Sequence, residues 1–244
     1  MKENKYDDPV FFQKYSEMER SQKGLAAAGE WKTLERMLPD FQGKRVLDLG
    51  CGYGWHCEYA SRHGATRVLG IDLSERMLAI ARAEHSRPGV EYRRMAMEEM
   101  DFGPNSFDIV MSSLALHYCA SFHDIARRVS RCLVSGGDFV LSTEHPVFTA
   151  QGSQDWCYDE RGEIRHFPVD RYFEEGARSA VFLGETVVKY HRTLTTILQG
   201  LLRSGFAITD FAEPQPDDRL IQTVPGMRDE MRRPMMMIVS ARKL

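Results

Sequence analysis

Three glycines at alternate positions follow a short apolar segment, and this pattern suits the binding of a ligand. Residues 45–49, Arg-Val-Leu-Asp-Leu, predict a buried strand. Gly50, Gly52 and Gly54 follow it directly. Glycine lets main-chain N–H groups approach a ligand closely, and the helix predicted at residues 55–63 directs its positive end to the same place. Glycine-rich turns also occur in proteins that bind no ligand there, so these residues alone are also consistent with a turn that has only a structural role.

Two carboxylates add to this candidate site. A second predicted strand, residues 67–71, ends at Asp72, about 20 positions beyond the glycine turn. An acidic residue there can accept hydrogen bonds from a ribose, which predicts a ligand that contains a nucleoside. Asp48 would repel a pyrophosphate but attract an ammonium group. In addition, the G-x-G-x-G spacing of residues 50–54 differs from the G-x-G-x-x-G of dinucleotide-binding proteins, which makes a dehydrogenase the least favoured reading.

The sequence D-L-G-C-G-Y-G at residues 48–54, followed by G-I-D-L-S at residues 70–74, resembles the class I S-adenosylmethionine-dependent methyltransferases. The resemblance extends over roughly residues 44–144 and, within the class, is to the UbiE-like branch that methylates small molecules. It implies S-adenosyl-L-methionine as the cofactor. It also implies a Rossmann-like, doubly wound and mostly parallel sheet of seven strands, with an antiparallel last strand.

The resemblance extends to individual cofactor-binding residues. In this family an N-terminal segment folds over the cofactor cleft as a lid, so Tyr15 and Arg20 are candidates to reach the methionine carboxylate or the substrate. The residues after the third strand are where the family binds adenine. The candidate cofactor-binding residues are Tyr15, Arg20, Asp48, Gly50, Cys51, Gly52, Asp72, Leu73, Met77, Ala96, Met97, Glu98 and Ser113.

Three histidines are candidates for a general base. Methyl transfer to oxygen, nitrogen or carbon depends mostly on positioning, so no metal or covalent residue is required. A base is needed only where the acceptor must lose a proton, and a histidine with a pKa near ~6.5 suits that task. His145 follows the fifth predicted strand, His191 lies between an aromatic segment and a helix, and His117 follows the fourth strand. For each, a packed structural histidine is the alternative.

The acceptor is predicted to be a small molecule rather than a nucleic acid. The net charge of −3 provides no general attraction for phosphate backbones. The loop that begins at Ser112-Ser113 lacks the two prolines of the Asn/Asp-Pro-Pro-Tyr loop found in methyltransferases of base amines. An RNA-modifying methyltransferase that works with an accessory chain stays open, as does a non-catalytic protein that binds S-adenosylmethionine. The identity of the acceptor and the oligomeric state are left open.

Length and composition predict a single domain over residues 1–244, because 43% hydrophobic residues suffice for a substantial core, and the resemblance implies that it is a methyltransferase domain. The five cysteines contain no C-x-x-C pair, which argues against a zinc site or a disulfide framework. The N-terminus lacks the apolar segment of a signal peptide, and no apolar run reaches about 18 residues. A cytoplasmic protein without a membrane span is therefore expected.

The order of predicted elements indicates how the candidate residues are positioned. Alternating strands and helices predict a parallel sheet with helices on both faces. The expected strands are 45–49, 67–71, 90–94, 106–112 and 138–143, and the expected helices are 55–63, 75–86 and 122–133. The expected segments are a lid of two helices at 1–42, a cofactor-binding core at 43–144, a substrate cap at 145–190 and a C-terminal part at 191–244. The C-terminal part is expected to contain a helix at 194–204, a polar loop at 217–233 and the last strand at 235–241.

Overall fold

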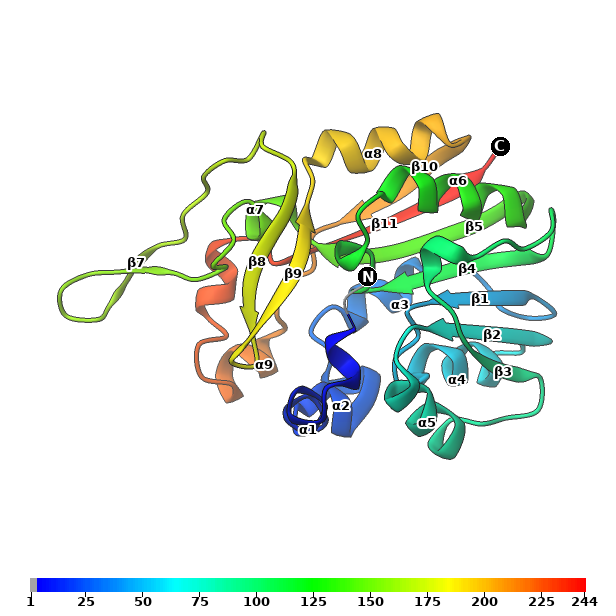
Figure 1. Cartoon of the computed structure of the whole chain (residues 1–244), viewed down its shortest axis with the longest axis horizontal. Helices are drawn as coiled ribbons and strands as arrows, with labels where there is room; N and C mark the ends of the chain where they lie inside the picture. Colours follow the sequence, from blue (N-terminus) through cyan, green and yellow to red (C-terminus); the bar gives the residue numbers. More distant parts are fainter. Residues whose placement is uncertain (1–3) are drawn as a thin grey trace.

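The computed structural model describes residues 4–244 and contains a seven-stranded sheet in the order β10-β11-β5-β4-β1-β2-β3 (Figure 1). Its strands are β1 (Arg45–Leu49), β2 (Arg67–Asp72), β3 (Val90–Arg94), β4 (Phe107–Ser113), β5 (Leu133–Glu144), β10 (Phe206–Ala212) and β11 (Met236–Lys243). Only β11 runs antiparallel to its neighbours β5 and β10 among the strands of this sheet. The predicted Rossmann-like sheet and its antiparallel last strand are confirmed.

Helices cover both faces of the sheet because successive strand residues point to opposite sides. Leu47 and Leu49 of β1 face a core completed by α6 and α8, whereas Val46 faces a second core completed by α4 and α5. The helices are α3 (Trp31–Met37), α4 (Trp55–Arg62), α5 (Glu75–Glu84), α6 (Phe122–Cys132) and α8 (Leu194–Arg203). Within residues 4–244, no helix is long and apolar enough to cross a bilayer.

The N-terminal segment forms three α-helices where two are predicted. They are α1 (Pro9–Ser16), α2 (Glu19–Lys23) and α3, with the 3-10 turns η1 (Lys5–Asp7) and η2 (Gly24–Ala27). Gly24 has a φ of +64°, a left-handed conformation that ends the second helix. A side chain at this position would also collide with the Trp55 ring, 2.7 Å from the position of its Cβ. Gly24 therefore separates α2 from α3, and the additional break, between α1 and α2, lies at residues 17–18.

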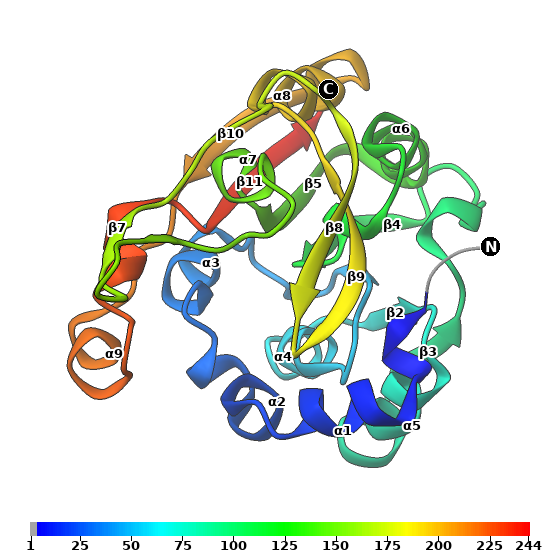
Figure 2. The same ribbon diagram turned by 60° about the vertical axis from the view of Figure 1, so that its left-hand side comes forward.

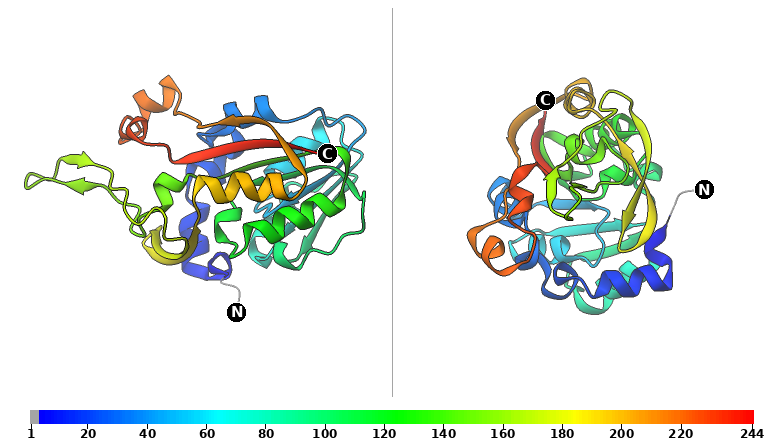
Figure 3. Two further views of the ribbon diagram at one scale, coloured as in Figure 1. Left: turned by 90° about the horizontal axis from the view of Figure 1, so that it is seen from above. Right: turned by 90° about the vertical axis from the view of Figure 1, so that its left-hand side faces the viewer.

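The segment after β5 begins with α7 (Pro146–Thr149) and then forms two antiparallel hairpins. The first hairpin pairs β6 (Cys157–Tyr158) with β7 (Ile164–His166) and projects away from the rest of the molecule (Figure 3). The second pairs β8 (Gly176–Phe182) with β9 (Glu185–His191), and we call it the cap hairpin. The prediction placed an aromatic-rich insertion here without its strands.

The cap hairpin and the N-terminal helices contact each other across the carboxyl ends of the parallel strands (Figure 2). Phe11 of α1 is fully buried and packs with Ala180 and Val187 of the hairpin. Lys14 Nζ donates a hydrogen bond to Leu183 O (3.1 Å) and lies 3.5 Å from Glu185 Oε1. The two segments thus form a continuous cover over one end of the sheet.

Two predicted boundaries are wrong. β5 begins at Leu133 rather than residue 138, because Gly136 and Gly137 lie within the strand instead of before it. The predicted polar loop at 217–233 contains α9 (Asp218–Thr223) and η5 (Asp229–Arg232). Asp217 starts α9 as its N-cap, since its carboxylate accepts a hydrogen bond from Leu220 N (2.9 Å).

Candidate active site

A cavity of about 980 Å³ lies at the carboxyl ends of the parallel strands, beneath the cover formed by the N-terminal helices and the cap hairpin. Strands β1 and β4 are neighbours at the centre of the sheet, where the strand order reverses. Ligands in open α/β sheets bind at this position. Every candidate cofactor-binding residue except Asp48 and Cys51 lines the cavity.

The glycine turn leaves room in this cavity. Gly50 and Gly52 have φ angles of +71° and +53°, in the left-handed region that favours glycine. A Cβ on Gly50 would lie 2.4 Å from the Cβ of Ala115, so the turn is packed tightly there. A Cβ on Gly52, in contrast, would meet no atom of the described chain within 4 Å. The open space at Gly52 belongs to the cavity that it lines.

Asp72 stands at the end of β2 on the cavity wall and orders the neighbouring backbone. Its Oδ2 accepts a hydrogen bond from Gly52 N (2.9 Å), and its Oδ1 accepts one from Ser74 N (2.8 Å). Burial raises the pKa of the Asp72 carboxyl, and these N–H groups oppose the shift. A carboxylate can accept about four hydrogen bonds, so Asp72 can still accept hydrogen bonds from the hydroxyls of a ligand.

The lid residues Tyr15 and Arg20 also reach the cavity. The Tyr15 ring packs edge-on against Tyr53 of the glycine turn, with 5.8 Å between ring centroids. Arg20 Nη2 donates a hydrogen bond to the buried Glu30 at Oε1 (3.0 Å), which leaves other guanidinium N–H groups for a ligand. The remaining lining residues of the candidate set are Leu73, Met77, Ala96, Met97, Glu98 and Ser113.

Asp48 and Cys51 are not brought to the cavity. Asp48 shares the face of β1 with Val46 and points toward α4, where its Oδ2 accepts a hydrogen bond from Cys57 Sγ (3.3 Å). Burial raises the pKa of Asp48 to about 7 and that of the Cys51 thiol to about 11. The structure therefore gives Asp48 no direct access to the ammonium group that the sequence assigned to it.

Two of the three candidate histidines, His145 and His191, do not line the cavity. Their rings instead contact residues of the segment that follows β5. His145 begins α7, because its Nδ1 accepts a hydrogen bond from Val147 N (3.1 Å), and its Nε2 lies 2.9 Å from Glu213 Oε1. His191 is fully buried, and its ring nitrogens contact Thr149 Oγ1 and Tyr172 O, both at 2.8 Å. This arrangement does not place either imidazole against a ligand in the cavity.

His117 differs from the other two because it lines the cavity. It lies in η4 (Leu116–Tyr118), immediately after β4, and is 5% exposed. Within residues 4–244, its Nδ1 has no hydrogen-bond partner. Burial lowers the pKa of His117 to about 4, so the imidazole is neutral at neutral pH and can accept a proton.

Three polar residues that sequence analysis did not select line the same cavity. Glu144 at the end of β5, Gln154 after α7 and Lys189 in β9 form a hydrogen-bonded cluster. Glu144 was visible as a carboxylate at a strand end. Lys189 carried a weaker signal, since it occupies a buried position in the alternating pattern of β9. That signal could be read only once residues 185–191 were known to form a strand.

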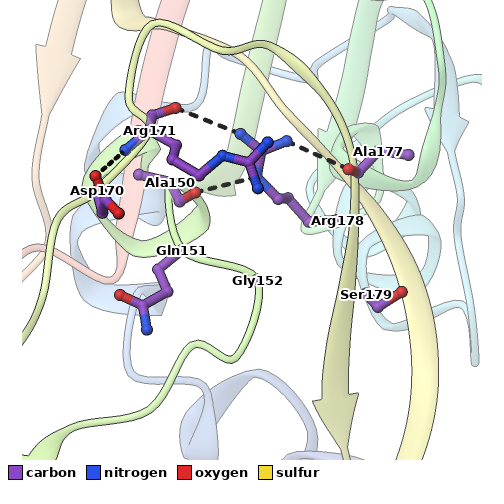
Figure 4. A pocket seen from close by; sticks show the side chains of 8 residues that line it. All are labelled: Ala150, Gln151, Gly152, Asp170, Arg171, Ala177, Arg178 and Ser179. Carbon is purple, nitrogen blue, oxygen red and sulfur yellow. Dashed lines mark hydrogen bonds between the residues drawn. The ribbon is translucent and has the colours of Figure 1, made fainter.

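A second, smaller hollow lies beneath the cap hairpin (Figure 4). Its most prominent charge is Arg178, whose guanidinium points to backbone carbonyls from several turns of the chain. It donates hydrogen bonds to Ala150 O (3.0 Å), Ala177 O (3.3 Å) and Glu174 O. Because these contacts occupy the cation, we assign Arg178 a structural role in holding the cap.

Comparison with known proteins agrees with this geometry. A family model described as a methyltransferase domain matches residues 47–141. An uncharacterized protein of Haemophilus influenzae is 31% identical, over 98% of this chain and 96% of that protein. A solved structure from Listeria monocytogenes is 56% identical, covers 91% of this chain and 99% of its own, and superposes with a TM-score of 0.86. One from Mesorhizobium loti is 46% identical, covers 90% and 100%, and has a TM-score of 0.83. Both solved structures are assigned to the S-adenosylmethionine-dependent methyltransferases.

Proposed function

Because this chain belongs to the class I S-adenosylmethionine-dependent methyltransferases, we propose that it methylates a small molecule held in the same cavity as the cofactor. The observation that carries this proposal is the continuity of the cavity, which extends from Gly52 to the cap hairpin within about 980 Å³. That volume is at the upper end of those that enclose small ligands.

The charges on the cavity wall support a small acceptor over RNA. The wall carries the carboxylates Glu19, Glu30, Asp72, Glu98 and Glu144 and the cations Lys5, Arg20 and Lys189. Carboxylates therefore outnumber cations, whereas a groove for a phosphate backbone needs an excess of positive charge. The cover over the cavity also restricts access for a polymer.

The residues present fit the cofactor. The open space at Gly52 is the kind of cradle that a Cβ would fill, and Asp72 lines the same cavity. In this proposal Asp72 accepts hydrogen bonds from the ribose hydroxyls. We assign the methionine end to Tyr15 and Arg20, and the adenine to residues 96–98 and Met77. S-Adenosylmethionine supplies an electrophilic methyl group when it is bound there.

In this proposal the protein contributes positioning, exclusion of water and one proton acceptor. Holding two reactants in line can supply on the order of 7 to 11 kcal/mol of the barrier, so positioning alone accounts for much of the rate. His117 accepts the proton that the acceptor loses, at Nδ1. The lid and the cap hairpin keep water from the reacting groups.

The test combines a binding measurement with a transfer measurement. Calorimetry should show that S-adenosylhomocysteine binds and that NADH does not. With methyl-labelled S-adenosylmethionine, label should enter the small-molecule fraction of a cell extract and not its purified RNA. Label in RNA alone, with affinity that falls steeply as salt rises, would favour the RNA-modifying alternative. Cofactor binding without transfer to either fraction would favour a non-catalytic binding protein.

Replacement of Asp72 by asparagine is expected to weaken S-adenosylhomocysteine binding at least about tenfold. The change keeps an oxygen for Ser74 N but removes the charge, and each hydrogen bond to a charged group contributes roughly 1.5 to 3 kcal/mol. Calorimetry at constant salt measures the effect. Asp108→Asn is the matched control, because Asp108 accepts a hydrogen bond from Arg45 N (2.8 Å) at the opposite end of the strands. Equal affinity in the Asp72 variant and the parent would contradict this placement of the ribose.

A further inference from the structure

The lining of the cavity includes apolar side chains as well as a cluster of buried polar groups near the cap hairpin. The apolar side chains from this side of the cavity and from the cap hairpin are Phe148, Val181, Phe182, Val187, Val188, Met235 and Met236. We define the acceptor cluster as His117, Glu144, Gln154 and Lys189, all of which line the cavity. Lys189 and His117 are 3% and 5% exposed, so both depend on partners within the site rather than on water.

Hydrogen bonds join three members of the acceptor cluster. Lys189 Nζ donates to Glu144 Oε1 (2.5 Å) and to Gln154 Oε1 (2.8 Å), and Gln154 Nε2 donates to Glu144 Oε2 (2.8 Å). Gln154 has a φ of +54°, which residues other than glycine rarely adopt. A strained backbone thus holds the Gln154 amide in contact with both the Lys189 ammonium group and the Glu144 carboxylate. Backbone strain of this kind is common in binding sites.

The electrostatics of the cluster link it to His117. Burial lowers the pKa of His117 to about 4, Glu144 opposes that shift, and Lys189 adds to it. Burial alone would raise the pKa of Glu144, but its interactions with His117 and Lys189 and its hydrogen bonds from Lys189 and Gln154 outweigh burial, and the pKa is lowered. At neutral pH the cluster therefore holds a Glu144–Lys189 ion pair and a neutral imidazole, with no net charge.

This neutrality argues against an anionic acceptor. In the described part of the chain, each cation on the cavity wall has a carboxylate partner: Lys189 has Glu144, Arg20 has Glu30, and Lys5 has Glu185. A carboxylate or phosphate brought to the cluster would thus find no unpaired cation, and burying it there would be costly. An uncharged polar group avoids that cost.

The hydrogen-bonding groups still available narrow the choice further. Glu144 and Gln154 occupy two of the three N–H groups of Lys189, and in residues 4–244 the third has no hydrogen-bond partner. His117 Nδ1 also lacks a partner there and is an acceptor when the ring is neutral. The cluster thus offers one donor and one acceptor to a ligand.

A hydroxyl group can bind to both the free donor of Lys189 and the free acceptor of His117. Its hydrogen can be donated to His117 Nδ1, and one lone pair can accept from Lys189, which leaves the second lone pair to attack the methyl group. A neutral amine has a single lone pair and cannot both accept from Lys189 and attack. A carboxylate has no hydrogen to donate. The aromatic and methionine side chains of the apolar wall suit a flat aromatic ring beside the hydroxyl.

We propose that the acceptor is an uncharged aromatic hydroxyl compound and that the acceptor cluster recognises its hydroxyl group. This inference rests on the proposed function. The oxygen–methyl bond forms as the sulfur–methyl bond breaks, and the bonding pair stays on the sulfur. His117 takes the hydroxyl proton at Nδ1, and Glu144 stabilises the imidazolium that results. Lys189 is a recognition residue that donates to the acceptor oxygen.

Four probes with one ring system test the proposal: 2-naphthol, 2-methoxynaphthalene, 2-aminonaphthalene and 2-naphthoate. Each is titrated by calorimetry into the whole 244-residue chain saturated with S-adenosylhomocysteine. We expect 2-naphthol to bind about tenfold or more tightly than 2-methoxynaphthalene and 2-naphthoate, which have no hydrogen to donate to His117. It should also bind more tightly than 2-aminonaphthalene, whose single lone pair is delocalised into the ring and accepts only weakly from Lys189. Tighter binding of the naphthoate or the amine, or no preference among the four, would overturn the proposal.

Variants assign the preference to the cluster. Lys189→Met removes the donor at similar side-chain length, and the double variant Glu144→Gln with Lys189→Met removes the ion pair without leaving a buried charge. Both are expected to bind 2-naphthol about tenfold more weakly than the parent, because the hydrogen bond to the hydroxyl oxygen is lost. Lys44→Met, at an exposed position directly before β1 and away from the carboxyl ends of the strands, is the matched control and should bind 2-naphthol as the parent does. Unchanged affinity for 2-naphthol in the double variant would overturn the role of Lys189.

Each titration begins with the binding of S-adenosylhomocysteine, and this step distinguishes a failure of the proposed function from a failure of the proposed acceptor class. Failure of S-adenosylhomocysteine to bind would overturn the proposed function, and this inference with it. Normal binding of S-adenosylhomocysteine without a preference for 2-naphthol would overturn only the assignment of the acceptor class.

Discussion

Replacement of Gly52 by valine is expected to abolish cofactor binding while the protein remains folded. A Cβ at this position meets no atom of the described chain within 4 Å, so the protein itself can accommodate it. The added side chain would instead occupy cavity space that we assign to the cofactor. Gly50 is a poorer test, because a Cβ there would lie 2.4 Å from Ala115 and disturb packing. Calorimetry with S-adenosylhomocysteine and a thermal melt of the same sample measure both parts of the expectation.

Gly136→Val is the matched control for this variant. Gly136 also has a left-handed φ, +75°, and also has open space around its Cβ position, but it lies toward the amino end of β5, away from the cavity. Both substitutions carry a backbone cost of about 1 to 3 kcal/mol, so their melting temperatures should fall by similar amounts. Only Gly52→Val should lose the cofactor. Retained affinity in that variant would mean that the turn has a purely structural role.

Replacement of His117 by asparagine is expected to lower the turnover rate by about 10² to 10⁴ with cofactor affinity unchanged. The neutral imidazole is the form that accepts a proton, and protonation removes this capacity. Because the pKa of His117 is lowered to about 4 by burial, the parent rate should rise with pH through that value and be level above it. The measurement is the pH profile of turnover, with the acceptor identified by the labelling experiment.

Two comparisons make the His117 result specific. His123→Asn removes an exposed histidine from α6 and should leave the rate unchanged. His145→Asn and His191→Asn should lower the melting temperature more than the rate, since both rings hold the cap through hydrogen bonds. Full activity of the His117 variant over the whole pH range would leave positioning as the mechanism, without a general base.

The central fold could be predicted from the sequence because its signals are local. Each parallel strand is a short apolar segment, and glycines or an N-cap residue mark where the next helix begins, as Ser74 does for α5. The cap hairpin could not be predicted in this way. β8 has only one buried residue, Ala180, and no continuous apolar face, and the apolar contact that covers Ala180 comes from Phe11, 169 residues earlier in the chain.

The residues of the candidate site also fall into two groups, those that the sequence could predict and those that it could not. Gly50, Gly52 and Asp72 lie next to strand ends, and the order of the chain is enough to bring them together. Asp48 does not line the cavity, because it lies on the face of β1 that is turned toward α4, where it contacts Cys57. The role of His145 and His191 could not be settled by position, since their partners come from distant parts of the chain. The same holds for Lys189, whose partners Glu144 and Gln154 are 45 and 35 residues away.

Phe11 belongs at once to the lid and to the core beneath the cap hairpin, and this has a consequence for the kinetics. Any movement of α1 away from the cap hairpin withdraws Phe11 from Ala180 and Val187. Loss of this apolar packing, together with the Lys14 contacts, loosens the cap hairpin at the same moment. We therefore expect entry of the methyl donor and entry of the acceptor to be coupled. In that case the demethylated donor and the methylated product leave in one shared opening step, of the kind that limits turnover in many enzymes.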